Sequence, residues 1–480
     1  MRRPARFSLL VVVAALAALV VSAPARADTM TLGTVTQWNE NASAVLISKG
    51  GQGASAVAHL AMVHGAVYDA VNSIERRHAP YLGWVPAKRW YSKDAAVAAA
   101  AYNVLIGSDP AVAPATAMEG LELRYNESLA TIPDGPAKQR GIATGTAAAE
   151  QMFNARRGDG RFGPFRFTPA LPGGPPGAWQ LTSPPANDPF AWLKDVKPFL
   201  IEDASDFASD GPNPLTSRRY TKEFDEVKAI GEKDSATRMP DQTAAVRFWG
   251  QGNAVGLWQS LLRGIAEAKH LPTADSARFF AMLELTAADA LIATWEDKAK
   301  WSFWRPVTAI REAEFDGNPD TDPQAGWTSE IGAPSYPEHP SGLSALSGAY
   351  TKTLRQFFGT DRMAFEGTNS PPQPMPPAPP VPSVTRNYTR FSQALQDVVD
   401  ARVWGGIHFR TADVQGAKIG KQVARFRSQQ RFFRPVGHHG HHDHHDGRWA
   451  TTVTTTTTTT TTTTETTTDA CDRRAGPSQL

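Results

Sequence analysis

Alanine and larger apolar residues recur at helical spacing through most of the middle of the chain, and this periodicity constrains the fold more than any other feature. The helical stretches cover ranges 54–74, 94–106, 118–129, 139–156, 242–268 and 274–304, and helix resumes near residue 388 and runs in pieces to about 429. No strand-like alternation is sustained, and no glycine-rich phosphate loop or dinucleotide fingerprint is present. We therefore predict an all-α protein built from packed helical bundles.

The composition predicts one folded domain over residues 28–435 with long Gly/Pro-rich loops. Hydrophobic residues make up 41% of the chain, enough for a large buried core. The 38 glycines and 37 prolines predict long loops, including 158–189 and the proline-rich stretch 371–382. The single cysteine, Cys471, excludes an internal disulfide and a cysteine-ligated metal site. The net charge of +2 argues against a general nucleic-acid binder.

Residues 1–27 are typical of a secretory signal peptide. Three arginines precede an apolar run over 7–21, and Ala25-Arg26-Ala27 forms a small-x-small cleavage site. The run has about 15 residues, whereas a membrane span needs roughly 20. We expect the segment to be removed, which leaves a secreted or extracytoplasmic protein with no stable membrane insertion.

Residues 436–480 are of low complexity. A histidine cluster over 438–445 is followed by a nearly pure threonine tract over 451–468. Because such a tract has no apolar face, we predict a disordered tail. Its histidines either bind a divalent metal weakly or have no selected role, and the composition favours the second interpretation.

The first candidate segment places two cations and several aromatic residues around the end of a predicted helix. Lys298 and Arg305 are seven residues apart, which predicts nearly the same helix face and roughly 10 Å between them along the axis. Pro306 disfavours helical geometry at Arg305, so we expect the helix to end there. Two solvated cations are the simpler interpretation, but the aromatic neighbours favour burial, and buried cations need a partner.

The second segment combines prolines with small residues before a predicted helix. Pro340 suits a first helical position, which would place the Ser341 hydroxyl and the Gly342 amide at a helix N-terminus. Such an end presents donors and a positive dipole to an anion. An ordinary capped helix start explains the segment equally well when it is taken alone.

The third segment carries Arg402 and His408 on either side of two glycines. Six residues would place the two side chains on different faces of a regular helix. Gly405 and Gly406 allow a break that could turn His408 toward Arg402. Together the three segments supply cations, helix-end donors and an imidazole, which are the groups needed to bind a tetrahedral or trigonal-bipyramidal oxyanion.

These three segments resemble the signature shared by vanadium-dependent haloperoxidases and the type 2 phosphatidic acid phosphatase superfamily. That signature reads Lys-x6-Arg-Pro, then Pro-Ser-Gly-His, then Arg-x5-His, and the chain meets the first and third spacings in full. The helical ranges also resemble the bacterial secreted haloperoxidase-like branch. The resemblance implies that the bound oxyanion is vanadate in a peroxidase and the substrate phosphate in a phosphatase.

The resemblance also implies roles for individual residues. The equatorial oxygens of the oxyanion would be held by Lys298, Arg305, Ser341, Gly342 and Arg402. His408 would bond vanadium axially, or attack phosphorus in a phosphatase. Trp295 and Tyr336 fall where the family's halide pocket has aromatic residues.

Leu343 departs from the family pattern, because the second motif ends in histidine and this chain has leucine there. In the family that histidine acts as the general acid–base. Since leucine cannot transfer a proton, turnover should fall by about 10²–10⁴-fold, while anion binding should suffer less. His339 lies four residues earlier but across Pro340, so we do not expect it to substitute.

We therefore expect a vanadate-dependent haloperoxidase-like protein that oxidises halide with hydrogen peroxide, weakened by Leu343. Two alternatives stay open: a secreted acid phosphatase that cleaves a phosphate ester through a phospho-His408 intermediate, and a non-catalytic phosphate- or vanadate-binding protein. The halide preference and the organic substrate are not determined by the sequence. The aromatic content is compatible with a homodimer but does not establish one.

Overall fold

The computed structural model describes residues 33–47, 53–108, 118–182, 190–369, 381–426 and 435, and the statements below concern these residues. The chain divides after Val436, and all described residues lie in the first part. The predicted signal peptide and the predicted tail lie outside the described residues, as does most of the proline-rich stretch. No described helix is both long and apolar enough to cross a membrane.

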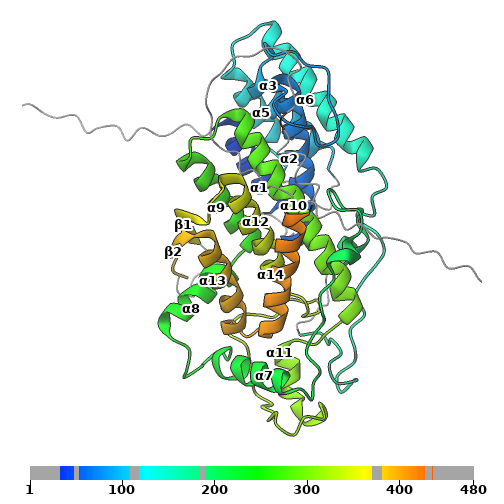
Figure 1. Cartoon of the computed structure of the whole chain (residues 1–480), viewed down its shortest axis with the longest axis vertical. Coiled ribbons are helices and arrows are strands. Elements are labelled where there is room, and N and C mark those ends of the chain that lie inside the picture. Colours follow the sequence, from blue (N-terminus) through cyan, green and yellow to red (C-terminus); the bar gives the residue numbers. More distant parts are fainter. Residues whose placement is uncertain are drawn as a thin grey trace, which may run out of the picture. The chain divides into compact units, whose positions relative to one another are not determined.

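The described residues are mostly helical, which confirms the predicted all-α class (Figure 1). The α-helices are α1 (Thr34–Leu46), α2 (Gly53–Glu75), α3 (Lys93–Ile106), α5 (Leu121–Ala130), α6 (Pro136–Ala155), α7 (Arg218–Ile230), α8 (Pro240–Gly250), α9 (Ala254–Ala268), α10 (Thr273–Trp301), α11 (Pro306–Arg311), α12 (Gly342–Phe358), α13 (Phe391–Trp404) and α14 (Arg410–Arg425). Three short 3₁₀ helices cover Ala191–Asp195, Ala204–Phe207 and Ala313–Phe315.

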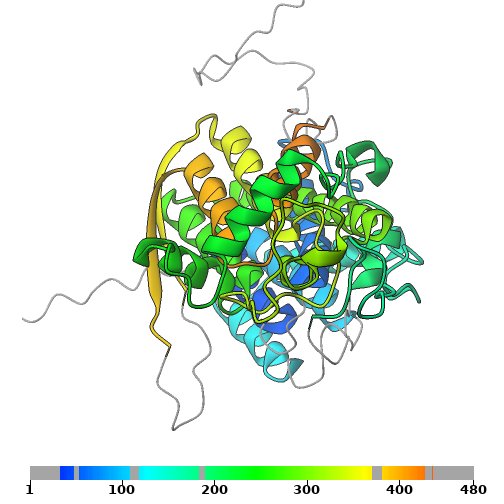
Figure 2. The same cartoon turned by 90° about the horizontal axis from the view of Figure 1, so that it is seen from below.

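A two-stranded antiparallel hairpin was missed by the sequence analysis. Strands β1 (Arg362–Asn369) and β2 (Val384–Arg390) pair Phe365 with Tyr388 and lie along one side of the helices (Figure 2). The prediction of helix from residue 388 was therefore wrong, and helix begins at Phe391. Most β2 side chains are not buried, so the strand carries little of the apolar alternation that identifies a strand in sequence.

The predicted helical stretch 242–268 is two helices rather than one. Gly252 adopts a φ of 79°, a left-handed conformation that glycine tolerates. The Asn253 side chain then accepts hydrogen bonds from the amides of Val255 and Gly256 and caps α9. The apolar pattern continues through this turn and does not predict it. In the sequence, only Gly252 and the capping residue Asn253 indicate the turn.

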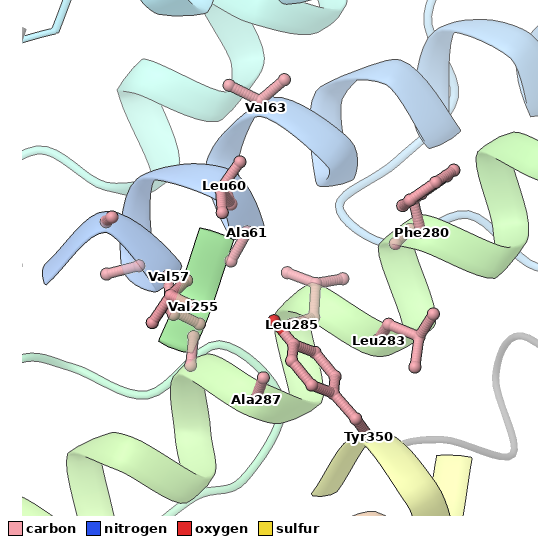
Figure 3. Close-up of a cluster of buried hydrophobic side chains, with 14 of the residues drawn as sticks. Val57, Leu60, Ala61, Val63, Val255, Phe280, Leu283, Leu285, Ala287 and Tyr350 are labelled. Carbon is pink, nitrogen blue, oxygen red and sulfur yellow. The ribbon is translucent and has the colours of Figure 1, made fainter. Parts of the chain in front are cut away.

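Helix α10 forms the centre of the core. Its side chains are buried over most of its 29 residues. Leu283 and Leu285 of α10 pack with Leu60 of α2 and with Tyr350 of α12 (Figure 3). The end of this rigid helix carries Lys298, so the core fixes where that side chain begins.

Helices α12 and α14 touch through small residues. A Cβ added at Gly416 would collide with the carbonyl oxygen of Ser341, and one at Gly420 would collide with that of Ala345. Only glycine allows such close backbone approach. This contact holds the start of α12 beside the first turns of α14, where the second and third candidate segments lie.

Candidate functional site

The structure brings the three candidate segments together. Arg305 Nη1 lies 3.2 Å from His408 Nε2, which joins the first segment to the third. Lys298 and Arg305 both donate to the carbonyl oxygen of Pro337, which joins the first segment to the second. We call the set of Lys298, Arg305, Ser341, Gly342, Arg402 and His408 the cationic cup.

Lys298 and Arg305 do not share a helix face, and that prediction was wrong. Helix α10 ends at Trp301, and Ser302 adopts a φ of 41°. Arg305 is extended, with φ −81° and ψ 155°, and Pro306 begins α11 directly after it. The expectation that proline removes Arg305 from helical geometry is confirmed, but the helix ends earlier than expected.

Carbonyl oxygens hold the first two cations in fixed positions. Lys298 Nζ donates to Pro337 O at 2.8 Å and to Glu338 O at 3.0 Å. Arg305 Nε donates to Tyr336 O at 3.1 Å, and Nη1 donates to Ile407 O at 2.9 Å. Both side chains are fully buried. Burial and the positive charge of Arg402 contribute to lowering the pKa of Arg305 to about 10, so it stays charged at neutral pH.

Ser341 and Gly342 lie at the N-terminus of α12, with Ser341 as the capping residue. The Ser341 hydroxyl accepts a hydrogen bond from the Ser344 amide at 3.4 Å. Pro340 precedes the cap, so its predicted place at the first helical position was wrong. A Cβ on Gly342 would lie 2.9 Å from the Trp295 ring, so glycine lets this ring approach the helix end.

Arg402 is a buried cation with no ion pair among the described residues. Burial lowers its pKa, and the nearby Asp413 carboxyl group partly opposes that shift. Arg402 lies in the last turn of α13, and its buried Nε has no hydrogen-bond partner in the described part of the chain. Gly406, with a φ of 78°, turns the chain after α13, and α14 begins at Arg410. Leaving a buried charged donor without a hydrogen bond is costly, so Arg402 Nε has hydrogen-bonding capacity that an anion could satisfy.

His408 is held at both ring nitrogens. Nδ1 lies 2.9 Å from Glu338 Oε1, and Nε2 faces Arg305. Burial, followed by the charges of Arg305, Arg402 and Lys298, lowers the pKa of His408 well below its usual value. The ring is therefore neutral at physiological pH, which is the form that can bond a metal or attack phosphorus.

Sequence reasoning missed two buried carboxyl groups beside the cup. Glu338 Oε1 accepts a hydrogen bond from the Phe409 amide and lies 2.9 Å from His408 Nδ1, and burial raises the pKa of Glu338 to about 8. Asp413 accepts from the Ser344 hydroxyl at 2.8 Å, and burial raises its pKa to about 7. Both residues stand inside the candidate segments, where three nearby cations could have indicated acidic partners.

A cavity of about 900 Å³ opens beside the cup. Its walls include Arg402, Gly342 and Leu343, together with Trp295 and Tyr336, whose ring centroids are 5.5 Å apart. The two aromatic residues proposed from the sequence therefore lie together on the cavity wall. The position where the family motif has histidine presents an apolar side chain to this cavity.

His339 is directed elsewhere. Its Nε2 lies 3.0 Å from the Ser209 hydroxyl, and its ring stands edge-on to Trp301. It is not among the residues that line the cavity. Burial lowers the pKa of His339 to about 3, so its ring is uncharged at neutral pH. These contacts support the expectation that it does not replace the missing histidine.

Comparison with known proteins places the three segments in a recognised domain. Residues 278–434 match the family model for the VCPO second helical-bundle domain, and this range contains the whole cup. Over part of its length, the chain is similar in sequence to a vanadium haloperoxidase. It is 28% identical over 196 residues to the vanadium chloroperoxidase of Curvularia inaequalis. That match spans 34% of this chain and 32% of the relative, so it covers about a third of the relative's length.

Solved structures show the same fold over most of the chain. A bacterial vanadium-dependent iodoperoxidase superposes with a TM-score of 0.66 at 20% identity and covers 84% of this chain and 96% of its own. An apo-type bacterial vanadium-dependent chloroperoxidase gives a TM-score of 0.63 at 18% identity, with coverage of 79% and 94%. At these identities the likeness establishes the helical fold of the vanadium haloperoxidases.

Proposed function

We propose that the cationic cup binds vanadate and that the protein oxidises halide with hydrogen peroxide as a haloperoxidase-like enzyme. The observation that carries the proposal is the buried Arg402, whose Nε has no hydrogen-bond partner among the described residues and whose charge acts on Arg305 and His408. A tetrahedral oxyanion would supply the negative charge that this cluster lacks. The relationship to the vanadium haloperoxidases favours vanadate as that oxyanion.

The residues present fit vanadate. Arg402 would donate to it directly, and the amide of Gly342 lies at a helix N-terminus, where anions are favoured. His408 would offer a neutral ring nitrogen as a ligand. Bound vanadate would supply Lewis-acid activation of peroxide. Lys298 is already held by carbonyl oxygens, so it would contribute charge with little reorganisation. Arg305 would keep its bond to Ile407 O and release the His408 ring.

Leu343 sets the expected level of activity. It lines the cavity beside Gly342 and offers no proton donor or acceptor. We therefore expect vanadate to bind while halide oxidation is slow, with bromide or iodide oxidised more readily than chloride. The direct test is calorimetric titration of the mature protein with vanadate, followed by dye bromination with bromide and peroxide. The absence of vanadate binding would refute the proposal.

An acid phosphatase is the second candidate, favoured by the neutral His408 ring. A lone pair on Nε2 could attack phosphorus and form a phospho-His408 intermediate. Without an acid histidine, this enzyme would favour substrates with good leaving groups. Hydrolysis of an aryl phosphate, inhibited by vanadate, would support this candidate over the peroxidase.

A non-catalytic oxyanion-binding protein is the third candidate, favoured by Leu343 itself. This candidate requires tight binding of vanadate or phosphate with no turnover of peroxide or phosphate ester. For any of the three functions we propose an exported protein, as the N-terminal sequence predicts.

A further inference from the structure

Glu338 connects all three candidate segments through four hydrogen bonds. Its amide donates to Phe303 O at 2.9 Å, and its carbonyl oxygen accepts from Lys298. Its side-chain Oε1 accepts from the Phe409 amide at 2.9 Å and lies 2.9 Å from His408 Nδ1. The residue is 1% exposed, so these contacts are shielded from water.

The donors and acceptors around His408 determine which nitrogen carries the proton. Arg305 has only donors, so Nε2 must accept the hydrogen bond from Nη1. A neutral ring that accepts at Nε2 carries its proton at Nδ1. That proton points at Glu338 Oε1, which is held in place by the Phe409 amide. The arrangement is consistent only with the Nδ1–H form of His408.

We propose that Glu338 is the positioning residue of the cup, which fixes His408 as the Nδ1–H tautomer and keeps the Nε2 lone pair directed toward the bound oxyanion. Glu338 acts through His408 and does not itself touch the ligand. Only the identity of that ligand rests on the proposed function. The tautomer assignment follows from the contacts alone.

The contacts also explain why Glu338, and not Arg305, must hold the ring. When an oxyanion bonds Nε2, Arg305 Nη1 has to release that nitrogen, while its bond to Ile407 O can remain. The bond to Glu338 is then the one that keeps the ring in place. Partners of this kind typically contribute about 10–100-fold to metal-ligand affinity or activity.

Three substitutions separate the acceptor, the ionisable carboxyl group and the reach of the side chain. Glu338→Gln keeps an acceptor oxygen, which the Phe409 amide orients, but cannot ionise. Glu338→Asp keeps a carboxyl group but is one methylene shorter. Glu338→Met removes the acceptor. We expect the Nδ1–H tautomer in the wild type and in Glu338→Gln, where Nδ1–H keeps its acceptor. In the other two variants only the 3.2 Å contact with Arg305 favours this tautomer, and Arg305 can release the ring, so we expect a mixture.

The primary measurement is ¹⁵N NMR of histidine-labelled full-length protein without vanadate. His59 provides an internal control, because its Nδ1 lies 2.9 Å from Ser55 O and its Nε2 lies 3.2 Å from Arg161 Nη1. The same donor argument therefore assigns Nδ1–H to His59, and no variant at position 338 should change it. An Nε2–H signal for His408 in the wild type would overturn the proposal, even if Glu338→Met did not fold.

Vanadate titration supplies a second readout. Affinity should fall about 10–100-fold in Glu338→Met and Glu338→Asp and stay within a few-fold in Glu338→Gln. Equal affinity in all three variants would contradict the positioning role. If the wild type binds no vanadate, the proposed function fails, while the NMR result still decides the tautomer.

Discussion

Arg305 and His408 are 103 positions apart in the sequence, yet Arg305 Nη1 lies 3.2 Å from His408 Nε2 in the buried cup. The contact places a fixed donor against the nitrogen that would bond the oxyanion. The charges of Lys298, Arg305 and Arg402 all act on this buried imidazole, so the three cations and the ring lie in one part of the fold.

Arg402→Ala should weaken vanadate binding without destabilising the empty protein. Loss of a charged hydrogen bond costs about 1.5–3 kcal/mol, which corresponds to roughly 10–100-fold in affinity. Since Arg402 Nε has no partner in the described structure, its removal should not lower the free energy of unfolding. Calorimetry and urea unfolding check the two effects. Arg355→Ala, at an exposed arginine paired with Asp361, is the control and should retain full vanadate affinity.

Leu343→His should raise halide oxidation by restoring an acid–base group on the cavity wall. The expected gain is about 10²–10⁴-fold in bromination rate, with a smaller change in vanadate affinity. Leu343→Gln is the matched control, because it adds polarity without proton transfer and should remain slow. If the histidine variant shows no turnover while it still binds vanadate, the peroxidase assignment is wrong and the binding-protein alternative is favoured.

Gly420→Ala should destabilise the fold, because its Cβ would collide with the backbone of α12. Overpacking of this kind typically costs about 1–3 kcal/mol. Gly264→Ala in α9 is the matched control, since nothing lies within 4 Å of its added Cβ. That change should stabilise the protein by about 0.5–1 kcal/mol through helix propensity. Urea unfolding of the two variants should therefore give opposite signs.

Ionisation of Glu284 should lower the free energy of unfolding as the pH rises. This side chain is buried in the core and accepts hydrogen bonds from Gln259 and Tyr350. Burial raises its pKa from 4.5 to about 7, so the folded state keeps this proton while the unfolded state loses it. Its favourable contribution is complete below about pH 4.5 and is lost as the pH rises toward 7.

Glu284→Gln should therefore stabilise the protein at pH 8 by up to about 3 kcal/mol and flatten the pH profile between 5 and 8. Urea unfolding across this range is the measurement. Glu314→Gln, at an exposed position, should leave the profile unchanged. If the free energy of unfolding of Glu284→Gln falls as steeply with pH as that of the wild type, the Glu284 carboxyl group does not cause the pH dependence.

The sequence predicted the helices best where the helical pattern was long and uninterrupted. Ranges 54–74 and 94–106 correspond to α2 and α3 within one residue at each end. The prediction failed where the sign of a turn was a single residue, as at Gly252, which separates α8 from α9 within one continuous apolar pattern. It also failed in β2, where few side chains are buried and alternation is weak.

The sequence by itself determined the helical class, the three candidate segments and the leucine at position 343, because each depends on residue types at short spacing. Only the tertiary structure decided that Arg402 Nε has no hydrogen-bond partner among the described residues and that Glu338 lies 2.9 Å from His408, 70 positions away. Burial and long-range pairing depend on how distant helices pack, and it is these contacts that set charge, tautomer and orientation at the site.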